Sequence, residues 1–143
     1  RAGTLPTPLI VGFAAAVQEA MADRDERHKR LAGLRDRLWN GLNDQLPAVE
    51  RNGAAAPRLA HNLNITLPGM SGSRLHRSLR PHLACSSGSA CSNGAPSHVL
   101  QALGRSRADA EASLRLSLGR STTENAVEQA IATIVEAVAA QQS

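Results

Sequence analysis

The chain has 143 residues, of which 42% are hydrophobic and 20% are charged, a balance typical of one globular domain. This balance excludes collagen-like, coiled-coil and low-complexity proteins. The 16 basic residues include a single lysine, Lys29, and the aromatic residues are only Phe13 and Trp39, so few side chains can stack on nucleobases. The formal charge is +4, but the arginines between residues 23 and 37 alternate with acids. We therefore expect solvated helix faces rather than a nucleic-acid partner.

Apolar residues recur at helical spacing through the first 46 residues, which we predict to be mostly helix. The two series are Ile10, Phe13, Val17 and Met21, and then Leu31, Leu34, Leu38 and Leu42. Two helices and one long bent helix both fit this pattern. The longest apolar run, Leu9 to Val17, is much shorter than the roughly 18 residues of a membrane span, so we expect no membrane partner.

Beyond the turn at Asn52 and Gly53, the spacing of apolar residues changes from helical to alternating. Leucine and isoleucine alternate with polar residues over 62–67 and again over 113–118, which predicts two half-buried strands. Between these strands we expect a short helix around Leu75 and Leu79, a strand near residues 82–85, and a Ser/Gly loop. A further helix should begin near Pro96, which we place in its first turn.

The sequence predicts a C-terminal helix that starts near Ser121. Ser121 followed by Glu124 indicates a capping box at its start. Its apolar stripe consists of Val127, Ile131, Ile134, Val135 and Val138. The predicted fold class is therefore α+β, with helices covering the apolar side of a small, mostly antiparallel sheet.

The segment CSSGSACSNGAP over residues 85–96 is unusually rich in small residues. None of the neighbours of Cys91 can bury its sulfur, so we expect an accessible thiol there, although a linker that happens to contain a cysteine also fits. Cys85 follows a predicted strand and is expected to be buried and unreactive. The five histidines show no metal-ligand spacing, and we predict no metal site.

Arg115 is the second candidate functional residue, because it is the only charge in an otherwise apolar and small polar strand. A strand gives its side chain a defined direction, and the planar guanidinium fork suits a carboxylate. The alternative is an arginine that pairs with an acid from elsewhere in the chain.

Three stretches resemble the cysteine desulfurases of the NifS/IscS group. The most specific is the loop SSGSACS over residues 86–92, followed by PSHVL over 96–100 and ALG over 102–104. The start, RAGT over residues 1–4, is similar to the Arg-Ser-Gly-Thr segment of that family. LRLSLGR over 114–120 and TTE over 122–124 resemble its late strand and final helix. The resemblance is collinear over essentially the whole chain.

The resemblance implies an aminotransferase-like fold of type I and a homodimeric, cytoplasmic pyridoxal-phosphate enzyme. Such an enzyme takes sulfur from L-cysteine and leaves L-alanine and a persulfide, which it passes to an acceptor such as an iron–sulfur scaffold protein. Cys91 matches the sulfur nucleophile, and Arg115 matches the arginine that holds the substrate carboxylate. Thr4 matches the threonine that reaches the cofactor phosphate of the partner subunit.

The family's Schiff-base lysine has no counterpart here, because Lys29 follows His28 but lacks the serine of the Ser-x-His-Lys motif. We therefore assign residues 1–46 to a helical segment leading from a cofactor-binding domain that these 143 residues do not include. Residues 47–143 form the C-terminal small domain, with its cysteine loop at 85–96. The chain alone is expected to be inactive. The alternative is a non-catalytic interaction or sulfur-relay domain.

Overall fold

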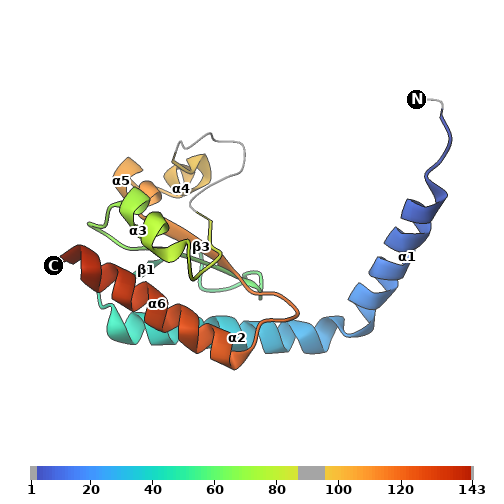
Figure 1. The fold of residues 1–143 in the computed structure, drawn as a ribbon, viewed down its shortest axis with the longest axis horizontal. Helices are drawn as coiled ribbons and strands as arrows, with labels where there is room; N and C mark the ends of the chain where they lie inside the picture. The colour runs from blue at the N-terminus through green and yellow to red at the C-terminus, as the bar shows by residue number, and fades with distance from the viewer. Residues whose placement is uncertain (1–2, 87–95, 143) are drawn as a thin grey trace.

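The structure is a computed structural model that describes residues 3–86 and 96–142 (Figure 1). The chain forms helices and three strands in an α+β arrangement, which confirms the predicted fold class. In chain order the elements are α1 (Thr7–Ala22), α2 (Arg24–Gln45), β1 (Glu50–Arg51), β2 (Asn62–Thr66), α3 (Gly72–Leu79), α4 (His98–Ala102), α5 (Arg107–Glu111), β3 (Ser113–Ser117) and α6 (Glu124–Gln142).

The sheet has the order β1-β2-β3, and both pairings are antiparallel. Leu63 lies opposite Leu116, and Ile65 lies opposite Leu114, so the apolar residues of both predicted strands share one face. The other face is polar and carries Asn64 and Arg115, together with the remaining polar residues of the two strands. The alternation in the sequence therefore predicted both faces, whereas the two-residue strand β1 was not predicted.

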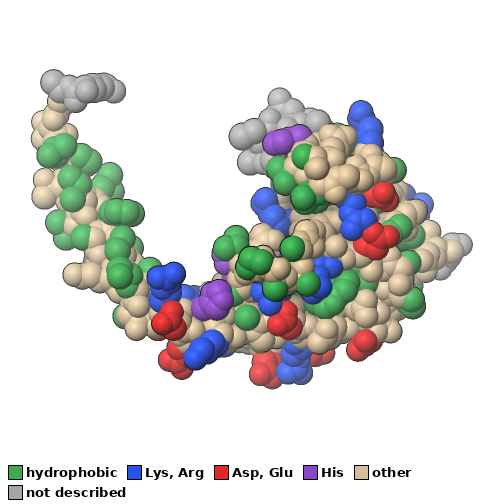
Figure 2. Space-filling model, turned by 180° about the vertical axis from the view of Figure 1, so that it is seen from behind, with side chains coloured by type: hydrophobic (Ala, Val, Ile, Leu, Met, Phe, Trp, Pro, Cys, Tyr) green, Lys and Arg blue, Asp and Glu red, His purple; other side chains and the backbone are tan. Residues whose placement is uncertain are grey.

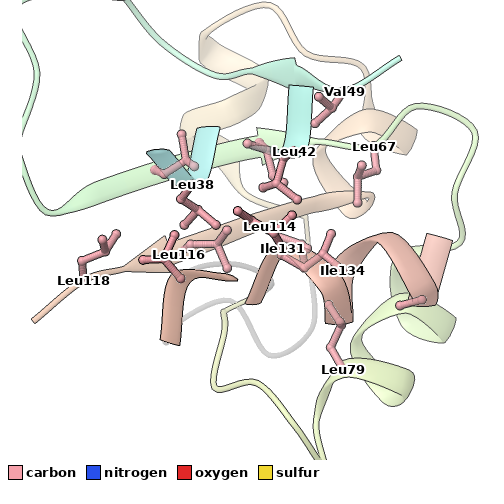
Figure 3. Packing of buried hydrophobic residues seen from close by; sticks show 14 of the residues in the cluster. Leu38, Leu42, Val49, Leu67, Leu79, Leu114, Leu116, Leu118, Ile131 and Ile134 are labelled. Atoms are coloured by element: carbon pink, nitrogen blue, oxygen red, sulfur yellow. The ribbon is translucent and has the colours of Figure 1, made fainter. Parts of the chain in front are cut away.

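Helices α2 and α6 run side by side against the apolar face of the sheet (Figure 1). The leucine series of α2 is buried together with the apolar strand residues and the α6 stripe, of which only Val135 is partly buried. Figure 3 labels Leu38 and Leu42 of α2 and Ile131 and Ile134 of α6 within this cluster. Each such side chain contributes about 1.5–3 kcal/mol on burial. Gly41 permits close approach of the two helices, because a Cβ at this position would lie 2.5 Å from Cδ1 of Ile131.

Helix α3 completes the core beside α6. Leu75 and Leu79 are fully buried, as expected from their spacing. Gly72 begins the helix where its backbone meets the end of α5, and a Cβ there would lie 1.9 Å from the carbonyl oxygen of Glu111. Arg74 and Arg77 of this helix, and Arg80 directly after it, are exposed.

Helix α1 projects away from the other elements (Figure 1). It is separate from α2, with Asp23 between them, so the N-terminal region forms two helices rather than one bent helix. None of its residues is buried, and Phe13 keeps 72% of its surface exposed. The apolar side chains along this arm are visible in Figure 2. The predicted helix is present, but no described residue covers its apolar side chains.

The segment before the cysteine loop differs from the prediction. Residues 82–85 form no strand, and only Ser86 makes an isolated bridge, to Arg115. The backbone N–H groups of His82 and Leu83 instead donate to the carbonyl of Leu79, at 2.9 and 2.8 Å. Residues 82 and 83 therefore belong to the turn that ends α3, where a strand was expected.

Two helix starts also differ from the prediction, and a short cap explains each of them. Helix α4 begins at His98 rather than with Pro96 in its first turn, because Ser97 Oγ accepts from the N–H of Leu100 at 3.4 Å. Helix α6 is capped by Thr123 rather than Ser121, since Thr123 Oγ1 accepts from the N–H of Ala126 at 3.1 Å. Across residues 3–86 and 96–142, no helix combines the length and the apolar character that crossing a membrane requires.

Candidate functional site

Arg115 occupies the centre of β3 on the polar face of the sheet, and its side chain is exposed. Its backbone is bound on the outer side of the strand, where its N–H donates to the Ser86 carbonyl at 2.9 Å and its own carbonyl accepts from the Ser86 N–H at 3.2 Å. This bridge bonds the Arg115 backbone on the outer side, and the pairing of β3 with β2 holds the strand on the other side. The side chain therefore leaves the sheet in a defined direction, as the sequence predicted.

No carboxylate among the described residues forms an ion pair with Arg115, so the predicted alternative of a structural ion pair finds no support there. Other arginines of the described chain do have acid partners: Arg27, Arg35, Arg37, Arg105, Arg107 and Arg120. A guanidinium stays protonated at all ordinary pH values. Arg115 is thus a fixed positive charge on a polar surface, suited to an external anion such as a carboxylate.

A buried hydrogen-bond network lies beside Arg115 on the same face. Its centre is Asn52, which is 5% exposed and whose amide nitrogen donates to Asn64 Oδ1 at 2.7 Å and to Thr66 Oγ1 at 2.9 Å. The amide oxygen of Asn52 accepts from Arg105 Nε at 2.6 Å. Thr66 Oγ1 and Ser113 Oγ lie 2.8 Å apart. In the sequence Asn52 stands out only as a turn residue, and the alternating polar positions of the strands are the signal that could have placed it near Arg115.

Cys91 lies outside the described residues, but the structure describes both ends of its loop. On one side, Ser86 is bound to the backbone of Arg115. On the other side, the buried Ser97 caps α4. Cys91 is five residues from Ser86, and an extended chain of that length spans at most about 17 Å. The covalent chain therefore limits how far Cys91 can be from the bridge between Ser86 and Arg115.

Cys85 is half-buried, and its Sγ lies 3.8 Å from Nδ1 of His76. Burial raises the pKa of the Cys85 thiol and lowers the pKa of the His76 imidazole, which the nearby backbone of Ser113 offsets only in part. Both groups are thereby kept neutral rather than as thiolate and imidazolium. This agrees with the expectation that Cys85 is unreactive.

Thr4 and Lys29 both lie away from Arg115. Thr4 is exposed and precedes α1, a helix of 16 residues that is about 24 Å long, at the end of the arm seen in Figure 1. Lys29 is exposed on α2, which packs against the opposite, apolar side of the sheet. The described residues therefore do not fit pyridoxal phosphate by themselves, because their only lysine is not on the face that carries Arg115. They also contain no group of three or more potential metal ligands.

Comparison with known proteins identifies the family. A family model described as aminotransferase class-V matches residues 1–130. Cysteine desulfurase IscS of Shewanella piezotolerans (strain WP3 / JCM 13877) is 42% identical over 140 residues, which are 96% of this chain and 34% of that protein. Cysteine desulfurase IscS of Dechloromonas aromatica (strain RCB) is 44% identical over 133 residues, which are 92% of this chain and 32% of that protein.

Solved structures agree with the sequence comparisons. A structure of a NifS-like protein superposes with a TM-score of 0.82 at 28% identity, covering 97% of this chain and 35% of that one. The NifS-like protein from Rickettsia africae ESF-5 superposes with a TM-score of 0.84, covers 97% of this chain and 36% of that one, and at 24% identity shows the fold. The chain spans about a third of the length of these relatives and corresponds to the C-terminal third of the IscS proteins. Because the family model covers residues 1–130, the chain belongs to the class-V aminotransferase family, as the resemblance to NifS/IscS cysteine desulfurases predicted.

Proposed function

We propose that this chain is the C-terminal portion of a cysteine desulfurase that takes sulfur from L-cysteine and leaves L-alanine and a persulfide on Cys91. The persulfide sulfur would be passed to an acceptor protein, such as an iron–sulfur scaffold, for the synthesis of iron–sulfur clusters or thio-cofactors. One observation carries the proposal: Arg115 is exposed on the polar face, has no acid partner among the described residues, and is bonded through its backbone to the base of the cysteine loop.

We assign to Arg115 the role of binding the carboxylate of the substrate. A guanidinium and a carboxylate form two parallel charge-assisted hydrogen bonds, which fix both the position and the orientation of the amino acid. A rigid strand is a suitable origin for this contact, since holding a substrate in one geometry removes much of the entropic cost of reaction. The carboxylate end of L-cysteine would thus be fixed while its sulfur is left for Cys91.

Cys91 is assigned the role of nucleophile. Its thiolate attacks the sulfur of L-cysteine, the new S–S bond forms, and the C–S bond of the substrate breaks with its electron pair remaining on carbon. Protonation of that carbon gives L-alanine, so no external oxidant or reductant is consumed. The small residues around Cys91 leave room for the substrate, and afterwards for an external acceptor, to approach its sulfur.

Pyridoxal phosphate would supply the electron sink for this chemistry in the complete enzyme. Of the residues in this chain, Thr4 is proposed to contact the cofactor phosphate of the partner subunit in a homodimer. Its exposed position at the end of the projecting helix α1, away from the Arg115 of its own chain, supports a contact outside the fold that carries it.

We also propose that residues 1–46 lead from a cofactor-binding domain and that residues 47–143 form the small domain. The apolar side chains of α1 support this assignment, because a helix with Leu9 and Phe13 each 72% exposed requires another surface to cover it in water. The IscS relatives have about two thirds of their length outside the matched region.

A second candidate is a non-catalytic interaction or sulfur-relay domain, which the position of Lys29 favours. A relay domain needs the loop cysteine but neither a Schiff-base lysine nor a bound amino acid. The intact mass of the protein as isolated from its native source, followed by borohydride reduction with pyridoxal phosphate, separates the two candidates. A chain near three times the length of this one that is labelled on a lysine of a Ser-x-His-Lys motif supports the desulfurase. A 15.0 kDa chain that is not labelled supports the relay domain.

The proposed desulfurase is tested in the complete, cofactor-loaded enzyme. Cys91→Ala should abolish L-alanine formation from L-cysteine, whereas the matched control Cys85→Ala should retain it. Arg115→Ala should raise KM for L-cysteine about 10- to 150-fold, which corresponds to about 1.5–3 kcal/mol for a charge-assisted pair. Arg107→Ala is the matched control, because Arg107 is also exposed but pairs with Glu111. Full activity of Cys91→Ala, or an unchanged KM in Arg115→Ala, would contradict the assignment.

A further inference from the structure

Asn64 is the direct cross-strand neighbour of Arg115. The backbone carbonyl of Asn64 accepts from the N–H of Asn52 on the β1 side, while the backbone of Arg115 bonds to Ser86 on the opposite side. The two residues therefore form a non-hydrogen-bonded pair of the antiparallel ladder, the type in which opposing side chains approach most closely. Their Cβ atoms are expected to be about 4.5–5.5 Å apart on the polar face.

A side-chain amide in this position could compete for Arg115. The amide oxygen of an asparagine is a good acceptor for a guanidinium, and a bond between them would occupy donors that a carboxylate ligand needs. Whether Asn64 competes depends on which end of its amide is free. The contacts of Asn52 decide this question.

The orientation of both amides follows from Arg105. Arg105 Nε can only donate, and it lies 2.6 Å from one end of the Asn52 amide, so that end is the oxygen. The other end of Asn52 is then the NH2 group, which lies 2.7 Å from Asn64. The atom of Asn64 that receives this bond must be its oxygen. This bond directs the Asn64 oxygen toward Asn52, on the β1 side, so the NH2 group is the end of the amide that remains toward Arg115.

Turning the Asn52 side-chain amide by 180° would be costly, because Asn52 is buried. Turning its amide would place an NH2 group against Arg105 Nε and an oxygen against Asn64 Oδ1. Each buried polar group that loses its partner costs about 1–3 kcal/mol. In the observed orientation the Asn52 NH2 group also donates to Thr66 Oγ1 at 2.9 Å, because the Thr66 hydroxyl gives its own proton to Ser113 Oγ, which donates to the Asp109 carbonyl.

We propose that Arg105, Asn52 and Asn64 act as a positioning chain for Arg115, engaging the Asn64 oxygen so that the guanidinium is available to the carboxylate of the substrate. The proposal assigns none of the three residues a contact with the reacting atoms. Their role is to keep the Asn64 amide oxygen away from the Arg115 guanidinium. The guanidinium then binds an external anion rather than an acceptor of its own chain. This inference rests on the proposed function of Arg115.

The decisive variant is Arg105→Met in the complete, cofactor-loaded enzyme, because it removes the Nε donor while keeping an unbranched side chain. Asn52 is then free to turn, and Asn64 can direct its oxygen to Arg115. KM for L-cysteine and the dissociation constant of L-alanine, measured by calorimetry, should both rise about two- to tenfold, the range of one ordinary hydrogen bond, while kcat is unchanged. Glu50→Gln is the matched control, since it removes the ion-pair partner of Arg105 but leaves the Nε donor in place.

The double variant Arg105→Met with Asn64→Ala separates positioning from misfolding. Removing the competing oxygen should return KM and the L-alanine dissociation constant to within about twofold of the wild type, which a misfolded protein would not do. Unchanged constants in Arg105→Met, or a double variant no better than Arg105→Met, would overturn the positioning chain. If Arg115→Ala leaves both constants unchanged, the proposed carboxylate site itself is wrong. If Arg115→Ala raises them but Arg105→Met does not, only the positioning chain is wrong.

Discussion

Gly72 lies directly against the backbone of Glu111 where α3 meets α5, and Gly72→Ala tests this contact. The added Cβ would lie 1.9 Å from the carbonyl oxygen and 2.6 Å from the carbonyl carbon of Glu111. Real Cβ contacts are essentially never shorter than 3.0 Å, and both of these atoms belong to the backbone, so no side chain can move aside. The start of α3 and the end of α5 must separate by more than an ångström. Overpacking of this kind costs about 1–3 kcal/mol.

In a chain of this size that cost corresponds to a fall in Tm of roughly 3 to 12 °C. Thermal unfolding of the 143-residue chain, followed by circular dichroism at 222 nm, measures the effect. Gly33→Ala is the matched control, because Gly33 is exposed within α2 and has nothing within 4 Å of an added Cβ. Replacing a helical glycine by alanine at such a site should stabilise the chain by about 0.5–1 kcal/mol. If Gly72→Ala melts at or above the wild-type temperature, the packing of α3 against α5 described above is wrong.

Three further predictions concern the core, the pH dependence and the buried network. Leu114→Ala should destabilise the chain by about 2–5 kcal/mol in urea unfolding, because Leu114 is 0% exposed, whereas Leu103→Ala at 59% exposure should stay within about 0.5 kcal/mol. Burial lowers the pKa of His76 below its ordinary 6.5, so the unfolded chain takes up the proton first and stability falls as the pH drops from 6.5 through the lowered pKa. His76→Gln should reduce this loss between pH 7.5 and 5.5, and an equal loss in the variant would rule out His76 as its source. Asn52→Ala should cost about 2–4 kcal/mol by leaving buried groups without partners, and a cost below 1 kcal/mol would show that water replaces its amide.

The regular elements that the sequence predicted correctly are those with a local pattern. The stripe of α6 and the alternation in β2 and β3 are visible within each segment, because one side of each segment faces the core along its whole length. Strand β1 has only two residues, Glu50 and Arg51, and its existence depends on pairing with Ile65 and Thr66. The helical spacing of α1 was visible for the same reason as that of α6. Its lack of a covering surface was not visible, since spacing shows that a face is apolar but not which part of the protein packs on it.

Arg115 and Asn64 show where prediction of the site stopped. A single charge in an alternating strand stands out from its neighbours, so the direction of Arg115 followed from the sequence. Asn64 is one polar residue among several on the same face, and an amide carries both a donor and an acceptor. Which of these it presents to Arg115 depends on Arg105, 41 positions further along the chain, acting through Asn52. The chemical character of the carboxylate site is therefore a property of the sheet pairing and of one distant donor, and only a structure that brings these residues together can reveal it.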